Sequence, residues 1–422
     1  MTPARCVVTG AGIISPLGTG MPANLDSLRR GAMGIVPIQS FPTQGFPISC
    51  AGEVRDPDIP AGAARMEAMA ALVMEEAMAA AQLPAPVGPD PARAVSFAIG
   101  KATLELEPLA QRCAADAAAL GSAGLDPDHL LRHYPELERH REYYDISAVL
   151  ERLARRAQAG GARYSCYTAC ASGNDAIGMG MRLIERGEAE VVIAGGTDSQ
   201  VHPLSMLEYE MLSALSREPA ATACRPFDRK RSGFVVGEGA AALVLESADH
   251  ARRRGAAVRA ELAGFGSSMD AFGLTKCHPQ GRGAAQAIQA ALDDAGLEPR
   301  SIDYLNAHGT GTLLNDQAEA AAIHAIWGAD TARLPVSSTK AMTGHLLIAA
   351  SAVEAVFSLL ALEEQLLPPN INYQNPDPEC QLQLITQPGQ HASLTTVMSN
   401  GFGFGGQNSS LILRRPPAPP IS

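Results

Sequence analysis

Short apolar runs alternate along the chain with longer stretches in which apolar residues recur at the spacing of a helix. Residues 5–14 and 94–100 are short apolar runs and predict buried strands. Residues 64–82 carry methionine, alanine and leucine along one stripe, and residues 346–365 are apolar over a similar length, so both predict helices. The alternation of strands and helices indicates an α/β protein built in layers.

The pattern starts again in the second half of the chain. Residues 258–268 predict a strand, residues 281–296 a helix, and residues 394–415 two strands around a glycine-rich turn. This restart indicates two similar halves. We therefore expect an N-terminal half over residues 1–255 and a C-terminal half over residues 256–415.

Two segments stand outside this pattern. Residues 103–162 are charged and mostly helical by pattern, and we expect them to form an atypical helical cap on the N-terminal half. Residues 416–422 read PPAPPIS, a proline-rich sequence with little apolar surface to bury. We expect this tail to be disordered.

Composition narrows the class of protein. With 422 residues and 46% hydrophobic content, the chain is too long for one small core and suits two packed lobes. Its formal net charge of -11 disfavours nucleic-acid binding, because phosphate contacts dominate that affinity. No apolar run of about 18 residues predicts a membrane span, and the N-terminus lacks the features of a signal peptide. The 8 scattered cysteines indicate free thiols and a cytoplasmic location rather than a disulfide framework.

Cys166 and Cys170 lie in the stretch YSCYTACASGNDAIG, which poses a choice between a metal half-site, a redox pair, a buried patch and a nucleophile. A CxxxC spacing without a second cysteine or histidine pair does not indicate zinc, and it is not the CxxC of redox proteins. Small residues and a predicted helix follow Cys170. A helix N-terminus stabilises a thiolate, so Cys170 is the candidate nucleophile. Cys166 is expected in the preceding strand, as a structural residue.

A second group of polar residues follows the predicted strand at 302–312. His308, Thr310 and Thr312 alternate there with Gly309 and Gly311. A single histidine is often structural, but the glycines expose the backbone around this one, which favours a functional interpretation.

Lys340, His345 and Glu354 form a third group. His345 is expected at the start of a strongly apolar helix, where an imidazole without a role is costly. Glu354 can share that helix, and the pattern alone fits equally well with a carboxylate on the surface.

Two glycine-rich stretches remain. Residues 399–410 carry Phe402 and Phe404 between glycines, which fits either a β-turn with aromatic packing or a mobile loop with apolar plugs. Residues 9–15, TGAGIIS, suggest dinucleotide binding at first sight. They lack the third glycine at the required spacing, so we reject that interpretation.

Taken together, TACASG, NAHGTGT…ND, KAMTGHLLIAASAVEA and GFGFGG resemble, in order and spacing, the motifs of elongating β-ketoacyl-[acyl carrier protein] synthases and type II polyketide ketosynthases. The resemblance covers nearly the whole chain apart from residues 103–162. It implies the thiolase fold, in which two βαβαβαββ halves form a five-layer αβαβα sandwich, usually as a dimer. A Cys–His–His set is the elongating pattern, and chain-length factors lack the cysteine, so the retained Cys170 points to an active subunit.

The resemblance also implies roles. Cys170 would carry the acyl chain as a thioester, and His308 and His345 would polarise the malonyl thioester and promote loss of CO2. The backbone N–H groups of Cys170 and the gating residue Phe404 would form an oxyanion hole. Lys340 and Glu354 would form a supporting charged pair, and Thr310 and Thr312 would bind the pantetheine arm. Asp316 and Glu319 would belong to a polar motif behind the histidine loop.

The chain departs from the family pattern at several positions. Ile348 and Ser351 replace glycines, and we expect tighter helix packing there; Gly401 and Gln407 replace serine and threonine. The basic face that docks an acidic carrier is depleted: Ser213 stands where many members have arginine, only Arg65 remains in the helix at 65–81, and residues 225–231 supply some positive charge.

The expected function is decarboxylative Claisen condensation of an acyl thioester on Cys170 with malonyl-acyl carrier protein, in a type II polyketide or specialised fatty-acid pathway. One alternative is an acyltransferase that does not decarboxylate, and another is a heterodimer subunit with reduced activity of its own. No metal and no tightly bound cofactor are expected, because phosphopantetheine arrives on the acyl carrier protein. The second partner would be another copy, or a related ketosynthase or chain-length-factor subunit, and neither nucleic acid nor membrane is expected.

Overall fold

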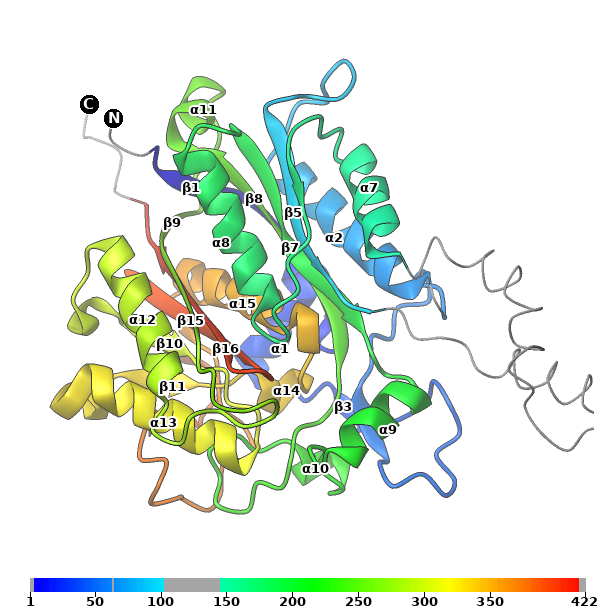
Figure 1. The fold of residues 1–422 in the computed structure, drawn as a ribbon, viewed down its shortest axis with the longest axis vertical. Coiled ribbons are helices and arrows are strands. Elements are labelled where there is room, and N and C mark those ends of the chain that lie inside the picture. The colour runs from blue at the N-terminus through cyan, green and yellow to red at the C-terminus, as the bar shows by residue number, and fades with distance from the viewer. Residues whose placement is uncertain (1–3, 63, 102–144, 417–422) are drawn as a thin grey trace, which may run out of the picture.

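The computed structural model describes residues 4–62, 64–101 and 145–416 (Figure 1). The first half contains β1 (Cys6–Ser15), β2 (Gly18–Thr19), α1 (Met21–Arg30), β3 (Ile35–Pro37), β4 (Cys50–Gly52), α2 (Arg65–Ala80), β5 (Arg93–Ile99), α7 (Ile146–Arg156), β6 (Arg163–Tyr164), α8 (Ser172–Glu185), β7 (Val191–Ser199), α9 (Pro203–Met211), α10 (Ala220–Ala223), β8 (Glu238–Ser247) and α11 (Ala248–Arg253). The second half contains β9 (Ala260–Met269), α12 (Arg282–Ala295), β10 (Tyr304–Asn306), α13 (Leu313–Trp327), β11 (Pro335–Ser337), α14 (Lys340–Thr343), α15 (Ala350–Glu364), β12 (Leu366–Leu367), β13 (Gln383–Leu384), β14 (Gln390–His391), β15 (Thr396–Gly403) and β16 (Gln407–Arg414).

The two halves repeat one strand order. In the first half the order is β1-β8-β7-β5-β6, and in the second it is β9-β16-β15-β10-β11, with β13 added at the edge. In both halves the first two pairings are antiparallel and the next two are parallel. The two sheets join where residues 6–8 of β1 pair with residues 260–262 of β9. The restart in the sequence pattern therefore corresponds to a repeated unit.

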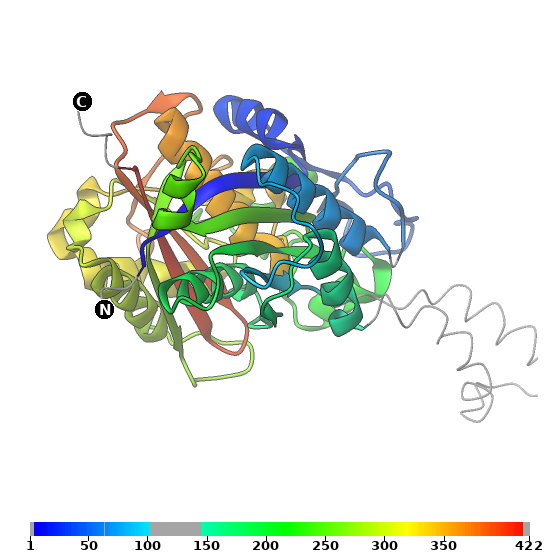
Figure 2. The ribbon, with the colours of Figure 1, turned by 90° about the horizontal axis from the view of Figure 1, so that it is seen from above.

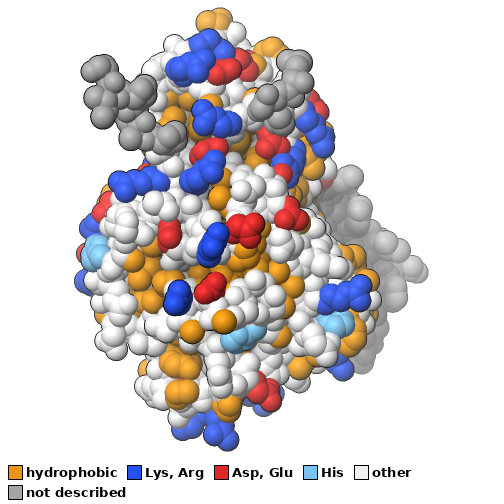
Figure 3. Space-filling model, turned by 90° about the vertical axis from the view of Figure 1, so that its left-hand side faces the viewer, with side chains coloured by type: hydrophobic (Ala, Val, Ile, Leu, Met, Phe, Trp, Pro, Cys, Tyr) orange, Lys and Arg blue, Asp and Glu red, His pale blue; other side chains and the backbone are white. Residues whose placement is uncertain are grey.

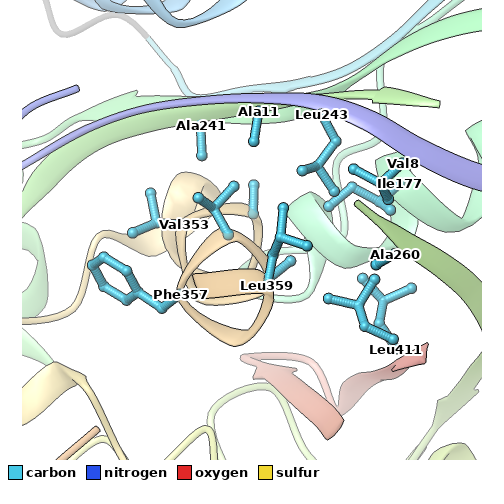
Figure 4. Packing of buried hydrophobic residues seen from close by; sticks show 14 of the residues in the cluster. Val8, Ala11, Ile177, Ala241, Leu243, Ala260, Val353, Phe357, Leu359 and Leu411 are labelled. Atoms are coloured by element: carbon cyan, nitrogen blue, oxygen red, sulfur yellow. The ribbon is translucent and has the colours of Figure 1, made fainter. Parts of the chain in front are cut away.

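The helices form three layers around these sheets (Figures 1 and 2). Helices α2 and α7 cover the outer face of the first sheet, and α12 and α13 cover the outer face of the second. Helices α8 and α15 lie between the sheets and contact each other. Figure 4 shows Val353, Phe357 and Leu359 of α15 packed beneath Ala11 and Ala241 of the first sheet. This is the expected αβαβα arrangement, with the largest apolar cluster around the two central helices.

The TGAGIIS stretch serves helix packing. A Cβ atom on Gly10 would lie 2.1 Å from the carbonyl oxygen of Ala77, and one on Gly12 would lie 2.1 Å from that of Val73. Side chains at these positions would push α2 away from β1. In the second half Gly264 and Gly266 of β9 play the same part, because a Cβ atom on either would collide with the backbone of α12.

Several local expectations need correction. Cys166 does not lie in a strand, because β6 ends at Tyr164. His345 does not begin the apolar helix: it forms a β-bridge with Val236, and α15 starts only at Ala350, after a short 3-10 turn. The expected mobile glycine loop is a hairpin, with Gly401 inside β15.

The expected cap is only partly covered by the described residues. Residues 103–144 lie outside them, but residues 146–156 form α7, which is not separate from the core. Its residues Val149 and Leu153 are buried in the cluster that α2 forms on the outer face of the sheet. Helix α7 thus corresponds to α13 of the second half. The half boundary at residue 255 stays a prediction, and it falls between α11 and β9. Residues 417–422 of the expected tail are also outside the described residues.

Candidate active site

The candidate nucleophile sits in a tight turn between β6 and α8. Cys170 is buried, and Ala169 before it has a φ of 48°, in the left-handed region. The Ser172 hydroxyl donates to the Ala169 carbonyl oxygen at 2.5 Å and accepts from the Thr168 N–H at 2.8 Å. These bonds hold the turn so that Cys170 lies two residues before the first turn of α8.

The protonation state of Cys170 differs from the sequence-based expectation of a low pKa. Burial raises the pKa of the Cys170 thiol to about 12, and the nearby carboxylates Asp198 and Glu354 also raise it. The Lys340 ammonium and the Phe404 backbone N–H lower the pKa of the thiol, but they do not outweigh burial. The residue therefore rests as a thiol, because the loss of water around the sulfur raises its pKa more than these two groups lower it.

His345 contacts the thiol directly. Its Nε2 lies 3.1 Å from Sγ of Cys170, and its Nδ1 accepts a hydrogen bond from the Leu347 N–H at 3.3 Å. An Nδ1 that accepts leaves the ring proton on Nε2. Burial and the charge of Lys340 hold the pKa of His345 well below its usual range, so the ring is neutral and its Nε2–H points at the sulfur.

His308 has the same tautomer for a different reason. Lys340 Nζ lies 3.2 Å from His308 Nδ1 and 2.5 Å from Glu354 Oε1, so it donates to both. The proton of His308 is therefore on Nε2. Burial, Lys340 and His345 lower the pKa of His308 well below its usual range. The two imidazole rings lie 5.2 Å apart, edge to face. Glu354 is buried, so the surface interpretation of this carboxylate is wrong.

Two buried carboxylates hold the loop that carries His308. Glu319 accepts the N–H groups of His308 at 2.8 Å and Gly309 at 2.7 Å. Asp316 accepts the N–H groups of Thr310 at 3.0 Å and of the following glycine at 3.2 Å. Burial raises the pKa of Glu319 to about 7. The motif behind the histidine loop therefore positions the backbone of the loop.

The candidate nucleophile and both histidines line one cavity of about 450 Å³. Cys170, His308, His345, Thr310 and Thr312 all line it, and the two threonine hydroxyls are 2.9 Å apart. Lys340 and Glu354 do not line it; Lys340 bonds both Glu354 and the cavity residue His308. Cys166 does not line the cavity either: it packs in a small cluster with alanines and Ile348.

The glycine-rich hairpin closes one side of the cavity. Phe402 is buried, with its ring 5.8 Å from that of His308, whereas Phe404 is 37% exposed at the turn. Gly405 and Gly406 both have positive φ angles, 83° and 76°, which a glycine adopts without strain. Only this turn, and not Gly401 or Gly403, has the loop geometry that the sequence suggested.

Sequence reasoning missed other cavity residues. Phe234 packs edge to face on His345 at 5.3 Å, and Tyr209 packs on Phe234 at 5.6 Å. Asp198, at the end of β7, lines the cavity although it is 1% exposed. A carboxylate that ends an otherwise apolar strand was the available signal for Asp198. No signal in the sequence singled out the two aromatic residues.

The basic residues expected near the site are mostly engaged elsewhere. Arg65 pairs with the buried Glu238, and Arg231 pairs with Asp316 and Asp377 in the interior. Arg229 and Lys230 are exposed. On the face shown in Figure 3, Lys and Arg side chains alternate with Asp and Glu, and hydrophobic side chains gather between them.

No group of three or more His, Cys, Asp or Glu side chains within residues 4–62, 64–101 and 145–416 is placed to hold a metal ion. No helix in the same ranges is long and apolar enough to cross a membrane.

Comparison with known proteins agrees with the geometry. The family model "Beta-ketoacyl synthase, N-terminal domain" matches residues 4–251, and "Beta-ketoacyl synthase, C-terminal domain" matches residues 259–374. The chain is 35% identical to 3-oxoacyl-[acyl-carrier-protein] synthase 2 of Staphylococcus aureus (strain COL), covering 97% of this chain and 98% of that protein. It is 36% identical to the protein of the same name from Coxiella burnetii, over 98% and 99% of the two chains.

Solved structures give the same result. A type II PKS acyl-carrier protein in complex with its ketosynthase bound to the hexaketide (AntDE:AntF) matches with a TM-score of 0.86 and 32% identity, over 98% of this chain and 100% of that chain. The ishigamide ketosynthase/chain length factor matches with a TM-score of 0.84 and 32% identity, over the same shares.

The chain therefore belongs to the β-ketoacyl synthase family and has its thiolase-like fold. Within that family it is a 3-oxoacyl-[acyl-carrier-protein] synthase, an acyltransferase.

Proposed function

We propose that the chain catalyses decarboxylative Claisen condensation of an acyl group on Cys170 with malonyl-acyl carrier protein, in a type II polyketide or specialised fatty-acid pathway. The observation that carries this proposal is the arrangement of Cys170, His308 and His345 in one cavity, with both imidazoles neutral and protonated on Nε2.

The first step loads the enzyme. The sulfur of Cys170 attacks the carbonyl carbon of the acyl thioester, the bond from that carbon to the carrier sulfur breaks, and the thiol proton leaves with the carrier thiol. The Nε2–H of His345 stabilises negative charge on the sulfur as the proton departs. The N–H groups of Cys170 and Phe404 would receive the oxyanion. Gly403 brings the two backbones together, because a Cβ atom there would lie 2.8 Å from the Cys170 nitrogen.

The second step makes the carbon–carbon bond. The malonyl carboxylate leaves as CO2, and its electron pair forms an enolate whose oxygen accepts the Nε2–H groups of His308 and His345. The enolate carbon attacks the acyl carbonyl on Cys170, and the carbon–sulfur bond breaks. The released Cys170 thiolate takes up a proton from solvent. Two neutral donors suit this step, because they stabilise the enolate and need no change in their own charge.

Besides the protein and the acyl and malonyl groups, the scheme needs only the phosphopantetheine arm that carries them. Phosphopantetheine would arrive on the acyl carrier protein, and the hydroxyls of Thr310 and Thr312 would hydrogen-bond it within the cavity. We propose no tightly bound cofactor and no metal for either step.

The specialised pathway is supported by the solved relatives and by the depleted docking face. Similar solved structures include a type II PKS acyl-carrier protein in complex with its ketosynthase, and a ketosynthase in complex with its chain length factor. In this chain Arg65 and Arg231 are tied into ion pairs, so they are not free to attract an acidic carrier. A related second subunit would supply the missing positive charge.

A homodimer is the competing arrangement, with arginines of residues 103–162 docking the carrier themselves. Arg155 and Arg156 on α7 are exposed. Arg156 pairs with Glu75 at 3.1 Å, and Arg152 pairs with Glu67 at 2.6 Å. Light scattering of the chain alone, and then together with neighbouring condensing-enzyme homologues, would distinguish the two arrangements. A homodimer that elongates malonyl-carrier unaided would exclude the heterodimer, and charge reversal of Arg155 and Arg156 would then test α7.

The experiment for the reaction itself measures CO2 released from malonyl-carrier in the presence of an acyl donor, together with the mass of the carrier product. We expect CO2 and a carrier product longer by two carbons. Acylation of Cys170 with transfer to another nucleophile and no CO2 would instead establish the acyltransferase alternative.

A further inference from the structure

One part of the cavity lining is polar. Five polar side chains line it: Lys101, Tyr167, Asp198, Gln200 and Tyr209. We call this set the polar wall. The apolar side chains Leu347 and Ile348 also line the cavity, so a bound chain would meet both kinds of surface.

The polar wall is rigid at its base. The Gln200 Nε2 donates to the Lys101 carbonyl oxygen at 2.5 Å and to Asp198 Oδ1 at 2.8 Å. Asp198 Oδ2 accepts the Ile348 N–H at 3.0 Å. Asp198 and Gln200 are each 1% exposed. Lys101 also pairs with Glu208 of α9, which joins the end of β5 to that helix.

Tyr209 presents the group best suited to contact a substrate. Its ring is fixed by Phe234, which itself packs on His345, so the position of the ring is coupled to the site. No residue in the described part of the chain hydrogen-bonds its hydroxyl. Burial raises the pKa of Tyr209, and the negative charge of Asp198 raises it further, so the hydroxyl keeps its proton and can donate.

A saturated hydrocarbon chain against this wall would remove water from the Tyr209 hydroxyl and return no hydrogen bond, which is unfavourable. An acyl chain with oxygen substituents would replace the lost water. We propose that the polar wall binds acyl chains that carry keto or hydroxyl groups, and that the Tyr209 hydroxyl donates a hydrogen bond to one of those oxygens. This inference rests on the proposed function, because it assumes that Cys170 holds the acyl chain.

The test measures acylation of Cys170 alone, by intact mass spectrometry over time, without malonyl-carrier. The donors are pantetheine thioesters of equal chain length: hexanoyl, and hexanoyl chains that carry a keto or a hydroxyl group near the far end. We expect the wild-type chain to load the oxygenated donors faster. Tyr209→Phe should reduce that preference about 2- to 10-fold, the effect of losing one hydrogen bond between neutral groups.

Tyr209→Phe keeps the ring that packs on Phe234, and circular dichroism would confirm that the variant folds. Tyr164→Phe is the matched control, because Tyr164 is exposed and does not line the cavity. It should leave the preference unchanged. Equal or faster loading of hexanoyl, or an unchanged preference in Tyr209→Phe, would overturn this inference alone. Failure of every donor to acylate Cys170 would overturn the proposed function as well.

Discussion

The Nε2 of His345 lies 3.1 Å from Sγ of Cys170, although the two residues are 175 positions apart in the chain. Cys170 precedes α8 and His345 precedes α15, the two central helices that the halves contribute to the middle layer. The repeated architecture thus brings equivalent ends of the two halves together. The site exists only where both halves are folded and packed.

Cys170 is expected to carry the acyl group. Replacing Cys170 with alanine should abolish the thioester adduct seen by intact mass spectrometry after exposure to acyl carriers, since no other sulfur lies at the start of α8. Cys166→Ala is the control and should keep the adduct, because Cys166 does not line the cavity. An adduct that persisted in Cys170→Ala would show that another residue is the nucleophile.

His308 and His345 are expected to act mainly after acylation. Each supplies one Nε2–H to the enolate, so His308→Ala and His345→Ala should each lower condensation about 10²-fold or more, the range for losing one oxyanion donor. Loading of Cys170, followed separately by mass spectrometry, should fall less. If loading fell as much as condensation in both variants, this division of roles would be contradicted.

Phe404 is expected to gate the cavity. It is partly exposed at a turn whose two glycines allow backbone movement, while Phe402 in the strand stays packed on His308. Phe404→Ala should keep the fold and lower condensation more than loading. Parallel measurements of the two rates test this, and an unchanged condensation rate in the variant would exclude gating by this side chain.

The Glu319 carboxyl should make stability depend on pH. Burial raises its pKa from 4.5 to about 7, so between these values the folded chain holds a proton that the unfolded chain has released. The stability of the folded chain relative to Glu319→Gln should therefore fall as pH rises through this window, by on the order of 3 kcal/mol in total. Denaturant midpoints of both proteins across the window measure the difference. A difference that stayed constant with pH would refute this assignment.

Ser351 and Gly401 are expected to be coupled. A Cβ atom on Gly401 would lie 2.8 Å from Cβ of Ser351, and the Ser351 hydroxyl accepts the N–H of Asn174 in α8 at 3.0 Å. Gly401→Ser alone should destabilise the fold by about 1–3 kcal/mol through overpacking. Adding Ser351→Gly should recover part of that loss, because it removes the colliding atom.

A double-mutant cycle on denaturant unfolding measures this coupling. The double variant would carry serine at position 401 and glycine at position 351, the combination that the family pattern leads us to expect in relatives. Additive effects of the two substitutions would mean that the contact carries no energy.

The sequence by itself determined the layered α/β class and most element positions. The strand at 5–14 and the helix at 64–82 were found within a residue or two of β1 and α2, because periodicity over a short window reflects which face of an element is buried. It also singled out Cys170, His308 and His345, since small residues and glycines beside a reactive side chain are local features.

Tertiary structure decided what depends on burial and on contacts between distant segments. The pKa of Cys170 rises where a local helix argument predicted a fall, because desolvation by the whole cavity exceeds the effect of one helix end. Glu354 and Lys340 become a buried pair only once α14 and α15 fold together. Gly10 and Gly12 allow α2 to pack closely on β1. Tyr209, from α9, lines the cavity. Apart from the Lys340–Glu354 pair, which the family resemblance implied, none of these follows from a short window of sequence, because the atoms that decide them come from elements far apart in the chain.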